Sequence, residues 1–177
     1  MVDERKAAIR EAPPPTLLGE MMRLVLKILI IVVVFLLLFT FMFGIIRYSD
    51  ETMNPAIKNG DVVMFYRLDK RYVATDAVVV EYEGNKQVRR VVAIAGDTVD
   101  ITEEGLIING ALQQEQDIYE ETLPFVEGIQ YPVTLQPGEI FVLGDKRTKA
   151  SDSRLYGPVK VEDTLGKVMT VVRRRGI

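Results

Sequence analysis

The most regular pattern along the chain is an apolar run without a single charge, from Ile28 to Ile46. Ile, Leu, Val, Phe and Met fill almost every position, and only Thr40 and Gly44 interrupt them. As a helix, the run is roughly 28 Å long, which matches the hydrocarbon thickness of a bilayer. A core helix of a soluble protein keeps a polar face over such a length, and this run has none. The pattern therefore predicts a transmembrane helix over residues 28–46.

A cleaved signal peptide is the alternative interpretation of this run. Its apolar region is usually about 7–15 residues long and ends in small residues. The run here is longer and leaves through Ile45-Ile46-Arg47-Tyr48, so we expect an uncleaved anchor. Arg23 and Lys27 on its N-terminal flank favour a cytoplasmic N-terminus, although Arg47 lies on the other flank. Residues 1–20 are expected to be a disordered tail. The predicted organisation is a cytoplasmic tail over 1–27, the span over 28–46 and an extracytoplasmic domain over 47–177.

After residue 60 the pattern changes to short β-branched runs separated by Gly, Asp and Asn. Runs of this length and composition favour strands, and Asn59-Gly60 and Asn109-Gly110 are typical turn sequences. No long helical periodicity follows the apolar run. The pattern predicts an all-β domain of coiled antiparallel sheets. The expected strands cover residues 62–66, 77–82, 88–94, 106–108, 139–143 and 167–172.

Composition narrows the chemistry, because the chain contains no His and no Cys. A Ser-His-Asp triad, a cysteine nucleophile and the common His/Cys metal sites are therefore excluded. Any hydrolysis must use hydroxyls, lysines and carboxylates, and we expect no cofactor and no metal. The lack of Cys is compatible with a compartment outside the cytoplasm and does not require one.

Charge is distributed unevenly, with no Lys or Arg between Arg90 and Lys146 and many acidic residues there. A solvated acidic surface is the favoured interpretation, and a docking face for a basic partner is the alternative. The terminal run Arg173–Arg175 indicates a solvated tail or a contact with anionic lipid headgroups. No nucleic-acid-binding motif accompanies it, so we expect no nucleic-acid partner.

Candidate chemistry lies in three segments, Glu51–Asp61, Val88–Asp97 and Val142–Arg154. Their order and spacing behind one apolar helix resemble the type I signal peptidases, in the Gram-positive-like form with a single anchor. That family's motifs read Ser-Met-x-Pro-Thr, then Lys-Arg-Val-x-Gly-x-Pro-Gly-Asp, then Gly-Asp-Asn-Arg-x-x-Ser-x-Asp-Ser-Arg. The resemblance implies the same β fold and the same orientation in the membrane. The matching framework positions are Met53, Pro55, Arg90, Asp145, Asp152, Ser153 and Arg154.

The departures fall on the positions that would carry the chemistry. Thr52 stands where the resemblance implies the nucleophilic Ser, and Arg89 stands at the general-base Lys. Ala150 replaces the Ser that orients that Lys, and Lys146 replaces the Asn after Gly-Asp. The catalytic Ser/Lys dyad is thus degenerate. The resemblance also implies that the Asp152–Arg154 pair braces the site without taking part in proton transfer.

Arg89 is the strongest argument against peptidase activity. The dyad needs a lysine whose pKa is depressed by burial, so that its neutral amine takes the hydroxyl proton. A guanidinium stays protonated in proteins and cannot do this. Thr52 is a weaker objection, because a threonine hydroxyl can be a nucleophile, but it has no free α-amine here and its methyl group crowds the site. We expect Arg89 to lie beside Thr52 and to bond Asp50, Glu51, Asp145 or backbone carbonyls, since an unpaired buried charge is costly.

Other lysines are the candidates for a replacement base. Lys86 lies at an odd offset from Arg89, which puts its side chain on the opposite face of one strand. Lys146 and Lys149 lie in the third segment, where a loop is free to bend either inward.

The favoured function is that of a non-catalytic, membrane-anchored protein. The resemblance implies a groove whose strands pair with an extended peptide, and that pairing uses the backbone and not the dyad. Proteins of this family with lost dyads act in pilus assembly, so exported or surface proteins such as pilins are the expected partners, besides the lipid bilayer. The alternative is an active signal peptidase with Thr52 as nucleophile and an unconventional base. A purely structural membrane scaffold is a third possibility without positive support.

Overall fold

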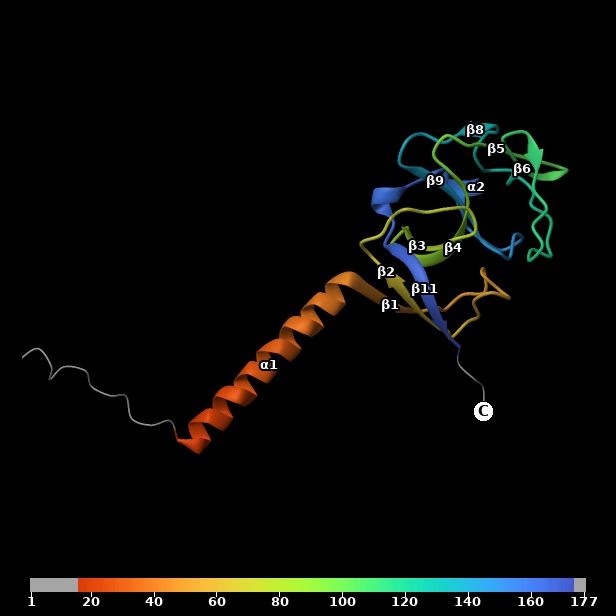
Figure 1. Ribbon diagram of the computed structural model, residues 1–177. Helices are drawn as coiled ribbons and strands as arrows, with labels where there is room; N and C mark the ends of the chain where they lie inside the picture. The colour runs from red at the N-terminus through yellow and green to blue at the C-terminus, as the bar shows by residue number, and fades with distance from the viewer. Residues whose placement is uncertain (1–15, 174–177) are drawn as a thin grey trace, which may run out of the picture. The chain divides into compact units, whose positions relative to one another are not determined.

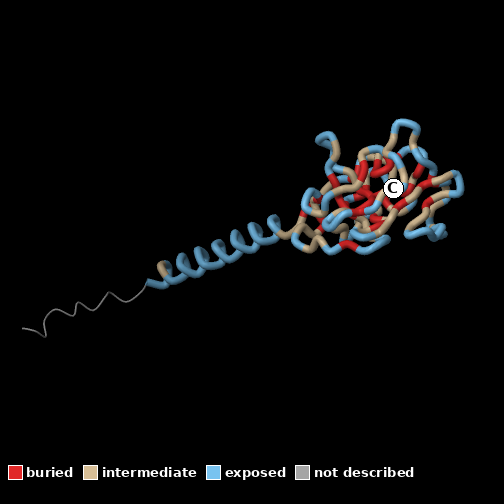
Figure 2. The backbone as a smooth tube through the Cα atoms, turned by 90° about the horizontal axis from the view of Figure 1, so that it is seen from above, coloured by how far each residue is buried: buried red, intermediate tan, exposed pale blue. Residues whose placement is uncertain are grey.

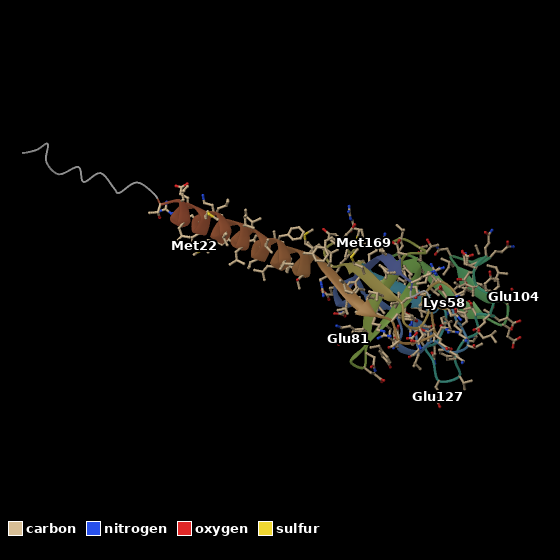
Figure 3. The ribbon with its side chains drawn as sticks, turned by 90° about the horizontal axis from the view of Figure 1, so that it is seen from below. Met22, Lys58, Glu81, Glu104, Glu127 and Met169 are labelled. Atoms are coloured by element: carbon tan, nitrogen blue, oxygen red, sulfur yellow. The ribbon has the colours of Figure 1, made fainter. Side chains whose placement is uncertain are left out.

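The computed structural model describes residues 16–173, and these divide into two units between Thr40 and Phe41. The first contains nearly all of helix α1 (Leu17–Met42), which has no buried residue. Figure 2 colours most of its backbone pale blue, for exposed residues, and Figure 3 shows its side chains, with Met22 labelled near its start. By length and by its mean hydropathy of 3.2, α1 is a candidate membrane span. A helix that is apolar on all sides suits lipid and not water.

The bounds of α1 correct the predicted ones. Residues 17–20 were expected in a disordered tail, but the helix already begins at Leu17, and the Thr16 hydroxyl accepts the Gly19 N–H at 3.3 Å. The remainder of that predicted tail, residues 1–15, lies outside the described residues. At the other end the helix stops at Met42, and the last residues of the predicted span instead form strand β1 (Phe43–Arg47). The apolar run continues past Met42, but the chain leaves the helix there. The backbone N–H and C=O groups of β1 are instead satisfied by pairing with β2 (Val62–Tyr66).

Two antiparallel sheets make up the second unit (Figure 1). The larger sheet has the order β1-β2-β11-β3-β4-β9-β10 and the smaller β7-β6-β5-β8. The all-β prediction is therefore confirmed. Over residues 43–173, only a short helix α2 (Ser153–Tyr156) and a 3-10 turn (Val161–Asp163) accompany the strands. The remaining strands are β3 (Ala77–Tyr82), β4 (Asn85–Ile94), β5 (Thr98–Thr102), β6 (Gly105–Ile108), β7 (Ala111–Leu112), β8 (Val133–Thr134), β9 (Glu139–Leu143), β10 (Val159–Lys160) and β11 (Gly166–Val172).

Alternating side chains of the strands build the core, which is drawn in red in Figure 2. One cluster joins Val63, Phe65 and Val88 to Met53, so the first motif is packed directly against the larger sheet. Gly44 has a packing role, because a Cβ there would overlap the ring of Phe65 on the neighbouring strand. Burial of these apolar side chains holds the motif-bearing loops in place.

The acidic stretch between Arg90 and Lys146 was predicted to be a solvated surface, and several of its acidic side chains are exposed. Glu103, Glu104, Glu121 and Glu127 are exposed, and Figure 3 shows Glu104 and Glu127 at the surface of the β domain. Within the terminal arginine run, Arg173 is exposed and residues 174 and 175 lie outside the described part of the chain.

Candidate active site

The first motif forms a turn between β1 and β2 that two hydrogen bonds hold in place. The Met53 N–H donates to the Tyr48 hydroxyl at 3.0 Å, and the Met53 side chain is fully buried in the core. The Lys146 N–H donates to the Thr52 carbonyl at 2.8 Å, which joins this turn to the third motif. Pro55 lies within the same turn. Thr52 is therefore held by both the sheet and the loop after β9.

The Thr52 hydroxyl is hydrogen-bonded on every side. It donates to Asp50 Oδ1 at 2.8 Å and accepts from Arg89 Nη1 at 2.8 Å. The Tyr48 hydroxyl lies 3.0 Å away and, because it already accepts the Met53 N–H, has its own proton for Thr52. Burial, followed by the Asp50 carboxylate, raises the pKa of Tyr48, so the phenol stays neutral. A hydroxyl has one proton and two lone pairs, and all three are engaged here.

Arg89 lies beside Thr52 as expected, and its acceptors are neutral. It lies on β4 opposite Val78, and the residue is 1% exposed. Its Nε and Nη2 donate to the Ser151 carbonyl at 2.9 and 2.8 Å, and Nη1 also donates to the Val88 carbonyl at 2.6 Å. Of the alternatives considered, the backbone carbonyls are confirmed and direct pairing with a carboxylate is not. The guanidinium thus closes the space beside Thr52 instead of offering a base.

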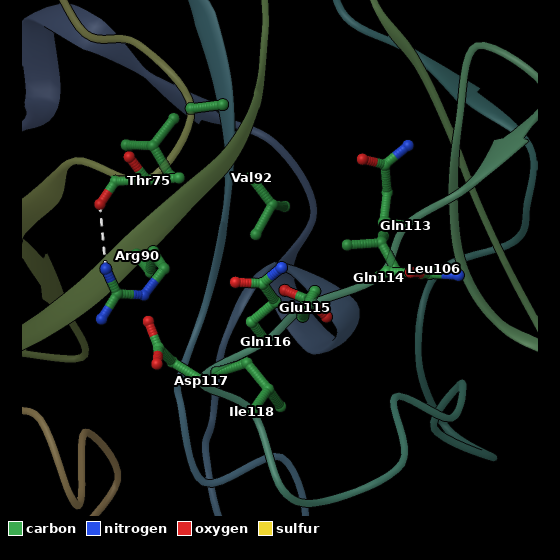
Figure 4. A pocket seen from close by; sticks show the side chains of 12 residues that line it. Thr75, Arg90, Val92, Leu106, Gln113, Gln114, Glu115, Gln116, Asp117 and Ile118 are labelled. Carbon is green, nitrogen blue, oxygen red and sulfur yellow. Dashed lines mark hydrogen bonds between the residues drawn. The ribbon is translucent and has the colours of Figure 1, made fainter.

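Asp145, one of the carboxylates expected for Arg89, instead binds the neighbouring Arg90. The two side chains form a bidentate pair, with Arg90 Nε and Nη2 at 2.7 and 2.6 Å from the carboxylate oxygens. The pair raises the pKa of Arg90. Arg90 Nη1 also donates to the Thr75 carbonyl at 2.9 Å, drawn as the dashed line in Figure 4. This pair connects β4 to the start of the third motif.

The third motif is fixed by a second, almost fully buried ion pair. Arg154 Nε and Nη2 each lie 2.9 Å from Asp152, whose Oδ2 also accepts the Gly144 N–H at 3.0 Å. Asp152 caps α2 by accepting the Arg154 N–H at 3.1 Å. The Ser153 hydroxyl accepts the Val142 N–H of β9 at 3.0 Å. These bonds hold the loop against the end of β9, and neither Asp152 nor Arg154 hydrogen-bonds Thr52.

Ala150 is 2% exposed and packs against Gly144, where a Cβ would overlap it. It immediately precedes Ser151, whose carbonyl receives two of the Arg89 bonds. The position that the resemblance assigns to a lysine-orienting hydroxyl therefore directly precedes the residue that binds the guanidinium, and it offers only a methyl group.

Tyr48 and Arg147 are site residues that sequence reasoning did not single out. Arg147 is fully buried, donates from Nε to the Gly144 carbonyl at 2.9 Å, and binds both oxygens of Glu115 at 2.5 and 2.6 Å. Arg147 Nη1 also donates a hydrogen bond to the Thr122 hydroxyl. Its match to the Arg of Gly-Asp-Asn-Arg was the available signal. Tyr48 lies four residues before Thr52, outside the three motifs, and no local sequence pattern marks it as a site residue.

The candidate replacement lysines do not reach the hydroxyl. Lys146 Nζ lies 3.8 Å from Glu51, and Lys86 is exposed opposite Glu81 on the neighbouring strand. Lys149 is exposed. Over residues 16–173, the side chains that bond the Thr52 hydroxyl are Tyr48, Asp50 and Arg89, and none is a lysine.

A groove of about 610 Å³ adjoins this cluster. One wall comes from β1 and the residues after it, 46–50, and the other from the β3–β4 turn and the start of β4, 84–87. β1 is an edge strand, and β4 pairs with β9 only from Arg90 onward. Within the described residues, both strands therefore bring an unpaired backbone edge to one groove, an arrangement that suits addition of an extended peptide.

Comparison with known proteins gives the family. The model of the family described as signal peptidase, peptidase S26, matches residues 21–173. Signal peptidase I of Bacillus caldolyticus is 28% identical over 142 residues, which cover 72% of this chain and 78% of that protein. Thylakoidal processing peptidase 1 of Arabidopsis thaliana is 28% identical over 132 residues, or 66% of this chain and only 38% of that longer protein. A solved structure of a signal peptidase I from Enterococcus faecalis V583 is 26% identical, with a TM-score of 0.48 over 56% of this chain and 97% of that chain. The match to the family model extends over most of the chain, which therefore belongs to the signal peptidase family S26.

Proposed function

We propose that this chain binds extended segments of exported proteins at the outer face of a membrane and does not cleave them. The observation that carries the proposal is the 2.8 Å bond from Arg89 Nη1 to Thr52 Oγ1. The guanidinium cannot take the hydroxyl proton, and it donates into a lone pair that nucleophilic attack would need. With Tyr48 and Asp50 engaging the remaining sites of the hydroxyl, Thr52 serves as part of a hydrogen-bonded wall.

Peptide binding needs none of the missing chemistry. An added strand is held by main-chain hydrogen bonds, and pockets for alternate side chains give selectivity. The unpaired edge of β1 and that of β4 before Val88 supply those main-chain groups, while the Val88 carbonyl itself already accepts Arg89 Nη1. The pairs Arg90–Asp145 and Asp152–Arg154 fix the third motif to β4 and to the end of β9 whether or not the site is catalytic.

The membrane arrangement is part of the proposal. Arg23 and Lys27 favour a cytoplasmic N-terminal flank, which leaves the β domain outside the cytoplasm once α1 crosses the bilayer. The partners are then the lipid bilayer and segments of exported or surface proteins. By analogy with signal-peptidase-like assembly factors, pilins are the specific candidates.

The test uses the full-length chain in detergent micelles and fluorescent peptides of about ten residues, a common strand length. Fluorescence anisotropy measures binding, and mass spectrometry of the same mixture measures cleavage, with peptides containing Ala-x-Ala included. Binding without cleavage is the expected result. Cleavage that the Thr52→Ala variant loses would overturn the non-catalytic assignment.

An active peptidase is the second candidate, and one contact favours it. Thr52 donates its hydroxyl proton to Asp50 Oδ1 at 2.8 Å, so a carboxylate stands where a base would accept that proton. The same oxygen also accepts the Thr52 N–H at 2.8 Å, which is the ordinary geometry of an Asx turn. Cleavage lost equally in Asp50→Asn and Thr52→Ala would support this second function.

A further inference from the structure

Gln87 is the residue of the groove whose polar group is left without a partner. Its Oε1 atom is buried and accepts no hydrogen bond within the described part of the chain. Two other buried side-chain atoms share this condition, the hydroxyls of Tyr131 and Tyr156, but neither residue lines the groove. Buried polar atoms are almost always paired in folded proteins, so an unpaired one on a residue that lines a groove points to a ligand for that side chain.

The other buried polar groups of the groove are already engaged. The Tyr48 hydroxyl binds Met53 and Thr52, and the Asp50 carboxylate binds Thr52 twice. The remaining polar lining side chains, Arg47, Ser49, Asn85 and Lys86, are exposed and are solvated without a ligand. Gln87 is therefore the lining residue for which a bound ligand would change the hydrogen bonding most.

The register of β4 places Gln87 relative to the catalytic-site positions. Gln87 lies opposite Val80 and Arg89 lies opposite Val78, so the two side chains share one face of the strand. They are about 7 Å apart along it. An extended peptide on the unpaired edge of β4 follows the same alternation. The peptide side chain that meets Gln87 is then two residues away from the one nearest Arg89 and Thr52.

We propose that Gln87 is a specificity-determining residue that selects an extended peptide with a hydrogen-bond donor in its side chain at this position. Asn, Gln, Ser and Thr carry such a donor, whereas Ala leaves Oε1 buried and unpaired. This inference rests on the proposed function, because it assumes that the groove takes an extended peptide. The amide nitrogen of Gln87 adds a donor of its own, so the side chain of Asn, which has both groups, is the best match.

The experiment scans one Asn through each position of an Ala- and Val-based peptide of about ten residues, a common strand length. Binding to the full-length chain in detergent micelles is measured by anisotropy. One position should show binding about 3- to 10-fold tighter than the Ala parent peptide, the worth of one neutral hydrogen bond. Gln87→Met, which keeps the length and removes both polar groups, should abolish that preference. Gln114→Leu, an exposed glutamine outside this groove, is the matched control and should keep it.

A second variant keeps the result interpretable if Gln87→Met folds poorly. Gln87→Glu retains an acceptor, so the Asn preference should persist in it. If peptides bind but the preference survives in Gln87→Met, or is absent from the parent chain, the role of Gln87 is wrong and the groove remains a peptide site. If no peptide binds at all, the proposed function fails and this inference fails with it.

Discussion

Arg89 and Thr52 meet through a 2.8 Å hydrogen bond from the guanidinium Nη1 to the hydroxyl oxygen. Two positions that the family uses for proton transfer are thus coupled by a bond in which the proton cannot move toward residue 89. The guanidinium also spans from β4 to the Ser151 carbonyl of the third motif. Position 89, which the resemblance assigns to the general base, is thus a structural connection between the strand and the loop.

The first prediction follows from the burial of that connection. Arg89→Ala leaves the Ser151 and Val88 carbonyls without their donors and opens a cavity, so it should cost at least about 2 kcal/mol of unfolding free energy. Thermal unfolding of the full-length chain in micelles measures the loss. Arg71→Ala is the control, because Arg71 is 91% exposed in its pair with Asp69 and such pairs are worth about 0–1 kcal/mol. Equal stability of Arg89→Ala and the parent chain would contradict the role of Arg89 as a structural connection between β4 and the third motif.

The second prediction concerns Tyr48. Tyr48→Phe removes the hydroxyl that accepts the buried Met53 N–H and contacts Thr52. An unsatisfied buried N–H costs about 1–3 kcal/mol, so the midpoint of chemical denaturation should fall clearly. Tyr119→Phe, at a side chain that is 82% exposed, should leave it unchanged. A Tyr48→Phe variant as stable as the Tyr119→Phe control would contradict the role assigned to this hydroxyl.

The third prediction is partial restoration of catalysis. The triple change Thr52→Ser, Arg89→Lys and Ala150→Ser supplies a nucleophile, a deprotonatable amine and a hydroxyl that orients it. The Arg90–Asp145 and Asp152–Arg154 pairs remain in place to hold the geometry. Cleavage of a peptide containing Ala-x-Ala, followed by mass spectrometry, should become detectable. The same chain with Thr52→Ala in place of Thr52→Ser should stay inert, and a folded but inactive triple variant would mean that the groove itself has diverged.

The fourth prediction concerns topology. Protease added to intact protoplasts should digest the β domain, since the charges flanking α1 favour its export. Lysed cells provide the comparison in which every accessible site is cut. Full protection of the domain in intact protoplasts, together with digestion after lysis, would reverse the proposed orientation.

Much of the fold follows from local patterns. The predicted strands over 62–66, 77–82 and 139–143 coincide with β2, β3 and β9, because short β-branched runs bounded by turn residues favour strands. β5 was missed, although Thr98–Thr102 alternates polar and apolar residues. β1 and the two-residue strands β7, β8 and β10 were not predicted either. Their residues carry no alternation long enough to read, and in β1 the apolar run continues that of the helix. Such strands form only where a neighbouring strand offers its edge.

By itself, the sequence determined that a base is missing at position 89, since no environment lets a guanidinium deprotonate near neutral pH. It also determined the apolar helix, the β class and the three motifs. Only the tertiary structure decided what replaces the dyad. The register of the sheet is set by burial of whole strands. It brings Arg89 to the carbonyl of Ser151 in a distant loop, and it pairs Asp145 with Arg90. The same long-range pairing brings the open edges of β1 and β4 to one groove, a relation that no local pattern encodes.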